Sequence, residues 1–427
     1  MFQGKGSAEH TISIEEMKHI FYSALDAAGS PQRVLVIPPD FTRYHSLAGE
    51  LTQMAWHYYG SRLKAILPAL GTHDPLTEQQ RSSMFGDIPQ ELFVDHRWRT
   101  DTLSLGTVSA DVIEELSEGA LSWSWPITVN KLMIEGNFDL VLSIGQIVPH
   151  EVAGMANYHK NLFVGIGGAE GINKSHYLGA VYGMERILGK TTTPVRELFT
   201  QAFKQAADAL PPVLFVHTVV QRKERDTYTL KGLYIGDDHR CYTEPCSLSQ
   251  EVNITSLKQP VKKVVAYLDP HEYKSTWLGN KAIYRTRLAL ADGGELIILA
   301  PGVGSFGEDP AIDRLIRTYG YSGRDQIIKR TKKEEELQHN LSAAAHLIHG
   351  SPDGRFRVTY CPGKLSRDEI QQAGYSYGDL DEMMNRYQPD TLCEGWNHIH
   401  NEDVYHIGNP ASGLWRYSKQ AEGEAHI

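Results

Sequence analysis

The stretch Arg33-Val-Leu-Val-Ile-Pro-Pro-Asp40 carries the clearest fold signal in this sequence of 427 residues. Its consecutive apolar residues, most of them β-branched, predict a buried strand that ends at the two prolines. Just upstream, a capping box that begins at Ser13 and an apolar face of helical spacing predict a helix over residues 14–28. A helix followed by a fully apolar strand is typical of an α/β sheet.

The same alternation continues along the first half of the chain. Further strands are predicted at 63–67, 138–144, 163–166 and 213–220, and helices at 47–60 and from Asp74-Pro75 onward. This order predicts a mostly parallel sheet, which binds ligands at the carboxyl ends of its strands. Four polar residues follow predicted strand ends: Asp40, Arg43, His73 and His150. We therefore expect these four side chains to share one site.

A second α/β region is predicted beyond a polar stretch, residues 247–259, which we expect to be irregular. Its predicted strands are 264–268, 295–299, 356–360 and 391–392, and its predicted helices are 276–291 and 329–349. The fold class is thus α/β, with two α/β domains, mostly parallel sheets and an active site in the cleft between them. We place the first domain at 1–256 and the second at 260–398, and expect the tail 400–427 to pack back on the first.

Composition excludes several classes of protein. The net charge of −10 argues against a nucleic-acid partner. The four cysteines form no C-x-x-C pair, which predicts neither a disulfide framework nor a structural zinc site and favours a reducing cytoplasm. The N-terminal stretch lacks the apolar core of a signal peptide, and no apolar run approaches the ~18 residues of a membrane helix. We expect a soluble, cytoplasmic enzyme without a membrane partner.

The densest group of reactive residue types lies between His150 and His176. Glycines there allow the backbone to approach a ligand closely. Lysine can bond covalently to a cofactor or hold a phosphate, and histidine can ligate nickel or zinc. The segment contains three histidines and two lysines among several glycines: His150, His159, His176, Lys160 and Lys174. Because the spacing matches no common zinc pattern, the residues alone predict a site and leave the metal open.

Two further classes of protein stay open at this point. One is a zinc- or iron-dependent hydrolase or lyase that uses His73, His150 and His176 as metal ligands. The other is a non-catalytic binding protein for an organic anion. Metal analysis separates the first of these from an enzyme with a covalently bound cofactor.

The second region offers weaker candidates. Lys281 opens a predicted helix and could meet an anion across a domain cleft, although a solvated surface lysine explains it equally well. The turn Gly302-Val-Gly-Ser-Phe-Gly307 follows a predicted strand and could cradle a phosphate. It matches neither the dinucleotide fingerprint nor a P-loop.

Taken in order, these motifs resemble the lactate racemase family, whose members use a nickel-pincer nucleotide. The resemblance spans most of the chain and rests on four ordered matches: Asp40-x-Thr-Arg43; Gly71-Thr-His73; Pro149-His150-x-x-Ala-Gly with Lys160 and His176; and Lys281 ahead of Gly293-Gly294. Several ordered matches are far more specific than any one of them.

The resemblance implies a cofactor and the residues that hold it. The cofactor is a pyridinium mononucleotide whose two sulfur-containing arms bind nickel. Lys160 would be its covalent anchor through a thioamide, and His176 the protein ligand of the nickel. Three other residues are expected at the cofactor: Thr42, Gly302 and Gly304. Separate assembly enzymes make this cofactor, so recombinant protein could be the apo form.

The resemblance also implies the reaction, which inverts C2 of a 2-hydroxy acid. His73 and His150 would be the paired acid/base residues, one on each face of the substrate. One of them takes the hydroxyl proton while hydride leaves C2, and the hydride then returns to either face. Asp40 and Arg43 would orient and polarise these groups. Lys281 would hold the substrate carboxylate, with Arg43 and Trp277 also at the substrate.

The chain departs from the family pattern at several positions. Asn157-Tyr158-His159-Lys160 replaces G-G-R-K, and Trp277-Leu278 replaces a Tyr-Gln pair. The Pro-Gly that usually follows the anchor is also missing. Because the chemical residues are kept while their surroundings differ, we predict retained catalysis and a substrate other than lactate, such as a larger hydroxy acid or an aldonate. The sequence leaves a homo-oligomer possible.

Overall fold

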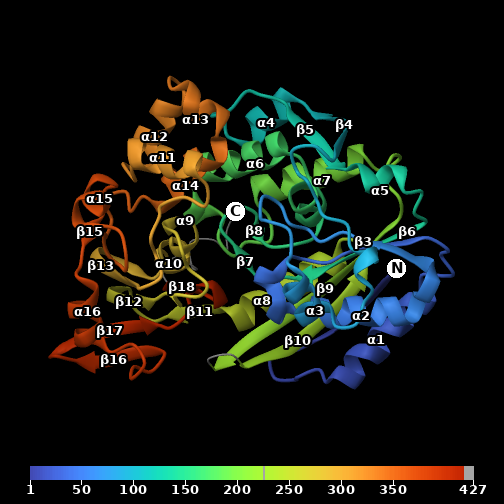
Figure 1. Ribbon diagram of the computed structural model, residues 1–427, viewed down its shortest axis with the longest axis horizontal. Coiled ribbons are helices and arrows are strands. Elements are labelled where there is room, and N and C mark those ends of the chain that lie inside the picture. Colours follow the sequence, from blue (N-terminus) through green and yellow to red (C-terminus); the bar gives the residue numbers. More distant parts are fainter. Residues whose placement is uncertain (225–226, 418–427) are drawn as a thin grey trace. The chain divides into compact units, whose positions relative to one another are not determined.

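The computed structural model describes residues 1–224 and 227–417, which divide into two units (Figure 1). The first unit contains Met1–Leu178 and Ile187–Asn253. The second contains Gly179–Arg186 and the chain from Ile254 onward. No helix in the described part of the chain has the length and apolar character needed to cross a bilayer.

The first unit is built on a six-stranded sheet in the order β1-β10-β9-β6-β2-β3. The four strands from β9 to β3 are parallel, and β10 and β1 are antiparallel additions at one edge. The strands are β1 (Phe2–Gly6), β2 (Val34–Ile37), β3 (Leu63–Ile66), β6 (Leu140–Gln146), β9 (Val213–Glu224) and β10 (Thr227–Gly236). This arrangement confirms the α/β class and brings the carboxyl ends of β2, β3 and β6 together.

Helices and two small strand pairs complete this unit. The helices are α1 (Ile14–Ala27), α2 (Ala48–Tyr59), α3 (Glu78–Phe85), α4 (Ala110–Leu116), α5 (Lys131–Glu135), α6 (Ala169–Tyr182), α7 (Pro194–Gln205) and α8 (Arg240–Asn253). β4 (Thr102–Val108) pairs with β5 (Trp125–Asn130), and β7 (Pro149–His150) with β8 (Gly154–Met155). Phe21 of α1 and Leu51 of α2 pack with Val34 and Val36 in one core, which covers one face of the sheet.

The second unit has its own six-stranded sheet, in the order β15-β14-β13-β12-β17-β16. All neighbours are parallel except β16 and β17. The strands are β12 (Val261–Tyr267), β13 (Leu290–Ala300), β14 (Arg357–Pro362), β15 (Ser376–Tyr377), β16 (Gly395–Ile399) and β17 (Glu402–Ile407). Separately, β11 (Ile254–Leu257) pairs with β18 (Leu414–Tyr417).

Short helices surround this second sheet. They are α9 (Thr276–Gly279), α10 (Lys281–Thr286), α11 (Pro310–Tyr319), α12 (Arg324–Thr331), α13 (Glu335–His339), α14 (Leu341–Gly350), α15 (Arg367–Gln372) and α16 (Leu380–Tyr387). The helix predicted over 276–291 is therefore two short helices, and its last residues begin β13. The helix predicted over 329–349 is likewise divided among α12, α13 and α14.

Two predictions in the first unit were wrong. Residues 163–166 are not a strand, because Asn161–Gly165 form a π-helix. A short apolar run cannot be distinguished from a buried helical segment by periodicity alone. The helix expected from Asp74-Pro75 begins only at Glu78, where Thr77 and Gln80 form a complete capping box. The hydrogen bonds of this capping box fix the start of the helix, and Pro75 therefore lies before it.

Two predictions in the second half were also wrong. The polar stretch over 247–259 is not irregular, because it contains the end of α8 followed by β11. Residues 391–392 are not in a strand. The described part of the tail belongs to the second unit, where β17 pairs with β12 and β18 with β11.

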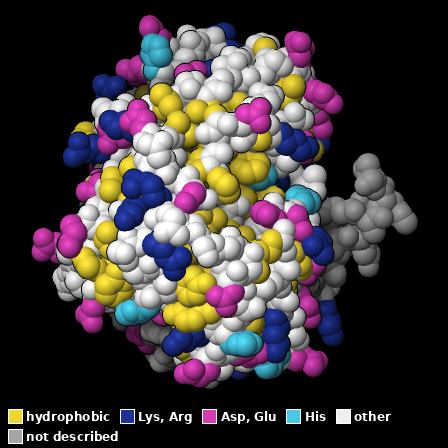
Figure 2. Space-filling model, turned by 90° about the vertical axis from the view of Figure 1, so that its right-hand side faces the viewer, with side chains coloured by type: hydrophobic (Ala, Val, Ile, Leu, Met, Phe, Trp, Pro, Cys, Tyr) yellow, Lys and Arg dark blue, Asp and Glu magenta, His cyan; other side chains and the backbone are white. Residues whose placement is uncertain are grey.

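Charged side chains of both signs are mixed on the face shown in Figure 2. This differs from the continuous basic surface typical of proteins that bind nucleic acids.

Candidate active site in the first unit

The loops after β2 and β3 form the first part of the site. Pro39 and Ala69 make a parallel bridge just beyond the two strands, so the residues that follow lie close together. Asp40 is buried, with 7% of its surface exposed, and it forms an ion pair with Nδ1 of His73. Its other oxygen accepts a hydrogen bond from Thr42 Oγ1 at 2.6 Å. The predicted proximity of Asp40 and His73 is therefore present in the structure.

The Asp40 carboxyl is held in its ionised form. Burial raises its pKa, but the hydrogen bond and charge of His73, together with Thr42 and Arg43, outweigh burial and lower it overall. A carboxylate can only accept hydrogen bonds, so Nδ1 of His73 carries the hydrogen and Nε2 keeps its lone pair. About half of the His73 side chain is exposed. This arrangement suits a general base whose protonated form is stabilised by a buried carboxylate.

His150 is held by hydrogen bonds of the opposite direction, since its Nδ1 accepts where Nδ1 of His73 donates. Its Nδ1 accepts hydrogen bonds from the backbone N–H groups of Val152 at 3.1 Å and Ala153 at 3.3 Å. In the neutral ring the hydrogen therefore lies on Nε2. The β7–β8 hairpin fixes this geometry, and Gly154 has a φ of 82° at its return. A Cβ at Gly154 would lie 2.2 Å from the carbonyl oxygen of Lys190, so only glycine fits there.

Lys160 immediately precedes the π-helix, which is tied to the sheet at both ends. The Asn161 side chain donates to Ile37 O at 3.3 Å and to Ser143 Oγ at 3.0 Å. At the far end, Gly71 N donates to Gly165 O at 2.8 Å. These bonds connect the π-helix to β2, to β6 and to the loop that carries His73. π-Helices are rare and often occur at functional sites.

Lys160 is influenced by several nearby charges, including that of Asp40. Burial, together with the charges of Arg43 and Arg196, lowers the pKa of Lys160 to about 8, while the charges of Glu151 and Asp40 oppose this shift. A lysine with such a pKa is partly neutral at physiological pH. Its amine is then available as a nucleophile.

His176, on α6, has one nitrogen committed to the backbone. Nδ1 lies 2.7 Å from Ile172 O and must donate to it, so Nε2 retains its lone pair. Burial, together with the charge of Lys160, lowers the pKa of His176 to about 4. A neutral imidazole whose other N–H is bound to a backbone carbonyl is the usual form of a metal-ligating histidine. The site residues therefore fit a nickel-bearing group that is anchored at Lys160.

His73, His150 and His176 do not form a metal site by themselves. Within residues 1–224 and 227–417, no group of three or more His, Cys, Asp or Glu side chains is arranged to hold a metal ion. The structure offers no support for the hydrolase or lyase interpretation, which needs these three side chains as ligands.

The remaining predicted residues belong to the second unit. Trp277 stacks on His346, with ring centroids 4.4 Å apart, and Lys281 begins α10. Gly302 packs against backbone, since a Cβ there would lie 2.7 Å from Pro270 and Tyr273. A Cβ at Gly304 would meet the Lys364 side chain at 3.1 Å. Close packing within the second unit thus explains Gly302, whatever its role at a cofactor.

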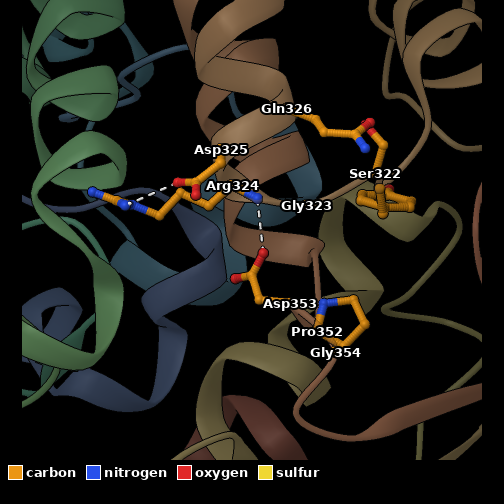
Figure 3. A pocket seen from close by; sticks show the side chains of 9 residues that line it. Ser322, Gly323, Arg324, Asp325, Gln326, Pro352, Asp353 and Gly354 are labelled. Carbon is orange, nitrogen blue, oxygen red and sulfur yellow. Dashed lines mark hydrogen bonds and ion pairs between the residues drawn. The ribbon is translucent and has the colours of Figure 1, made fainter.

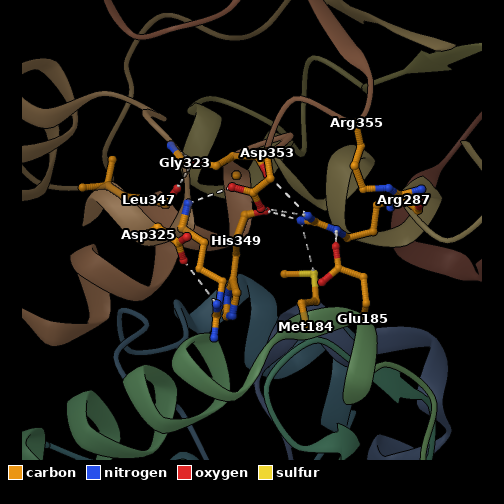
Figure 4. Close-up of polar contacts among 12 residues, drawn as sticks. Met184, Glu185, Arg287, Gly323, Asp325, Leu347, His349, Asp353 and Arg355 are labelled. Carbon is orange, nitrogen blue, oxygen red and sulfur yellow. Dashed lines mark hydrogen bonds and ion pairs between the residues drawn. The ribbon is translucent and has the colours of Figure 1, made fainter. Parts of the chain in front are cut away.

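The second unit also has a cavity of about 540 Å³ at the start of α12 (Figure 3). Two backbone N–H groups there are bonded to side chains: Arg324 N donates to Asp353 Oδ1 at 2.7 Å, and Gly323 N donates to Ser351 Oγ at 3.0 Å. The buried Arg287 completes this region by donating to Glu185 at 2.7 Å and to His349 O at 2.8 Å (Figure 4). These bonds fasten segment Gly179–Arg186 into the second unit.

Two residues of the site were missed by the sequence analysis. Glu151 follows His150 directly and acts electrostatically on Lys160 and His176, so its position beside a candidate base could have indicated it. Arg196 lies on α7, far along the chain from Lys160, and no local pattern marks it.

The fold and this site define a class of protein: an α/β protein with an Asp–His pair, a partly neutral lysine and a neutral histidine near the ends of parallel strands. Residues 17–186 match the family model described as the lactate racemase N-terminal domain. The first unit is therefore similar to the lactate racemase N-terminal domain, the family that the motifs of this chain resemble.

Proteins similar to this chain include a curated relative and solved structures. It is 25% identical to the lactate racemase of Thermoanaerobacterium thermosaccharolyticum over 245 residues, which are 55% of this chain and 51% of that protein. The match thus spans about half the length of that relative. A Thermotoga maritima protein of known crystal structure has the same fold, with a TM-score of 0.80 and 23% identity. The match covers 95% of this chain and 98% of that chain. The lactate racemase apoprotein from T. thermosaccharolyticum has a TM-score of 0.69 and 18% identity. The match covers 93% of this chain and 92% of that chain.

Proposed function

We propose that this protein is an isomerase that inverts C2 of a 2-hydroxy acid. The observation that carries the proposal is the Asp40–His73 pair beside Lys160 and His176, in a unit that matches the lactate racemase N-terminal domain. A base with a buried carboxylate partner is suited to taking the proton of a weakly acidic hydroxyl.

Lys160 and His176 would hold a nickel-pincer nucleotide, the first by a covalent bond and the second through Nε2. When bound, that group supplies a hydride acceptor and donor at the substrate C2. Separate assembly enzymes would have to provide it, in the reducing cytoplasm that the free cysteines favour.

The chain's own residues manage the proton. His73 Nε2 would accept the hydroxyl proton, and Asp40 would stabilise the imidazolium that results. His150 would present its Nε2–H to the substrate oxygen on the opposite side. Arg43 would polarise that oxygen. Lys281 and Trp277 of the second unit would bind the rest of the substrate, and Trp277 with Leu278 in place of Tyr-Gln favours a substrate other than lactate.

The test is to produce the protein together with cofactor-assembly enzymes and to measure its intact mass and nickel content. We expect an adduct at Lys160 and one nickel per chain, and neither with Lys160→Arg as the matched control. Chiral 2-hydroxy acids and aldonates are then incubated with the loaded protein, and the epimer ratio is followed by NMR. A protein that carries nickel and adduct but inverts none of these compounds would contradict the proposed activity.

A further inference from the structure

Two consecutive residues before Lys160 adopt a backbone conformation that side chains rarely accept. Asn157 has a φ of 62° and Tyr158 a φ of 58°. Glycine adopts this left-handed region readily, and asparagine tolerates it better than other residues. A tyrosine in this conformation persists only where its surroundings hold it there.

A buried guanidinium provides part of those surroundings. Arg196, on α7, is only 3% exposed. Its Nη1 donates to Asn157 O at 3.1 Å, and its Nη2 donates to Met155 O at 2.6 Å. The planar fork of arginine can join two carbonyls in fixed geometry, which a lysine ammonium cannot do. Arg196 thus clamps the chain where the left-handed pair begins.

Aromatic stacking holds the second member of the pair. The Tyr158 ring lies parallel to Tyr242, with centroids 4.9 Å apart and an angle of 9° between the planes. The Arg196 guanidinium lies over the same Tyr242 ring at 4.4 Å. The backbone N–H of Tyr158 also donates to Asn157 Oδ1 at 2.7 Å. Arg196 and Tyr158 are therefore fastened through the same ring.

The other end of this segment is fixed to the sheet by Asn161, as described above. Lys160 lies between the two attachments. Its position is therefore determined by Arg196 on one side and by β2 and β6 on the other.

We propose that Arg196 is a positioning residue for Lys160: its guanidinium holds the Met155 and Asn157 carbonyls so that the left-handed pair delivers Lys160 to the strand ends. This inference rests on the proposed function in one respect: the reason to position Lys160 is that a cofactor is attached to it. The clamp itself is a property of the protein alone.

The experiment measures amide hydrogen exchange by mass spectrometry in full-length, cofactor-free protein. In Arg196→Met we expect exchange of peptide 155–162 to accelerate by about tenfold or more, while peptide 213–220 of β9 keeps its protection. Arg196→Lys should behave like Arg196→Met, because a point charge cannot join both carbonyls. It also provides a milder change should the methionine variant fail to fold. Arg287→Met removes a buried guanidinium from the second unit and should leave peptide 155–162 unchanged.

A second substitution tests the reason for the clamp. Glycine needs no support in the left-handed region, so adding Asn157→Gly to Arg196→Met should restore much of the protection of peptide 155–162. In the presence of assembly enzymes, the adduct at Lys160 should decrease in Arg196→Met and recover in the double variant.

Equal acceleration in peptides 155–162 and 213–220 would show that Arg196 has only a general structural role and would overturn the proposal. So would full protection of peptide 155–162 in both Arg196 variants. An absence of adduct in the wild-type protein contradicts the proposed function instead, and it leaves the exchange results as the test of the clamp.

Discussion

In the first unit, His73 and His176 bond to the protein through Nδ1 and keep a lone pair on Nε2, whereas His346 in the second unit uses both nitrogens. His346 Nδ1 lies 2.8 Å from Tyr284 Oη and Nε2 lies 2.9 Å from Tyr321 Oη. Trp277 covers one face of this ring. A histidine with one nitrogen available can accept a proton or a metal, while one with both engaged holds a structure together. The contrast agrees with the proposed function, in which the histidines of the first unit carry the proton chemistry, whereas His346 supports the structure of the second unit.

The largest effect should come from His73. Replacing it with glutamine removes the base but keeps the size and a polar group, so kcat should fall by about 10²–10⁴-fold. The matched change in the second unit, His346→Gln, should leave kcat within about tenfold, because that ring makes only structural bonds. The measurement is the racemisation rate of each variant produced with its cofactor. Equal losses in the two variants would remove the distinction drawn between the units.

A smaller loss is expected for His150→Gln. In the proposed function His150 donates a hydrogen bond to the substrate oxygen, and losing one such donor typically lowers kcat by about 10²–10³-fold. The variant should keep its adduct at Lys160 and its nickel. If activity disappears as completely as in His73→Gln, His150 exchanges a full proton in each turnover.

The buried histidines should make stability depend on pH. Burial lowers the pKa of His217 in the first unit to about 4 and that of His346 in the second unit to about 3. Below about pH 6.5 the unfolded chain takes up protons that these folded rings do not. Stability should therefore fall as pH decreases from about 6.5, by up to about 1.4 kcal/mol per pH unit and ring, and should not change through these groups above 6.5.

Denaturant unfolding between pH 4.5 and 7.5 checks this dependence. His217→Gln and His346→Gln should each make the curve less steep below pH 6.5. An unchanged slope in both variants would show that other groups control acid unfolding.

The smallest expected effects compare two capping boxes, one in each unit. Thr77 caps α3 together with Gln80, and Ser366 caps α15 together with Glu369. Thr77→Ala should lower the free energy of unfolding by about 1 kcal/mol. Ser366→Ala should cost somewhat more, because Glu369 also pairs with Arg317 at 2.7 Å. Neither change should alter kcat, and a loss of activity in either variant would point to a wider role.

The sequence was most informative where structure is local. Asp40 and His73 could be placed together because each follows an apolar strand, and parallel strands end at a common edge. The resemblance to a family then indicated Lys160 and His176. The way these residues are held could not be predicted, because it depends on contacts distant in sequence. The clamp by Arg196 joins α7 to residues 155–157, and no pattern along the chain signals a left-handed Asn157–Tyr158 pair.

The π-helix after Lys160 limits the length of this segment more strictly than its composition. Its defining hydrogen bond runs from Ile166 N to Asn161 O at 3.2 Å, a span of five residues where an α-helix has four. Deleting one residue there would restore α-helical spacing and turn Lys160 by about 100° relative to the residues that follow. The segment can therefore exchange its apolar side chains for others of similar size, whereas a change of one residue in its length would turn the lysine away from its partners.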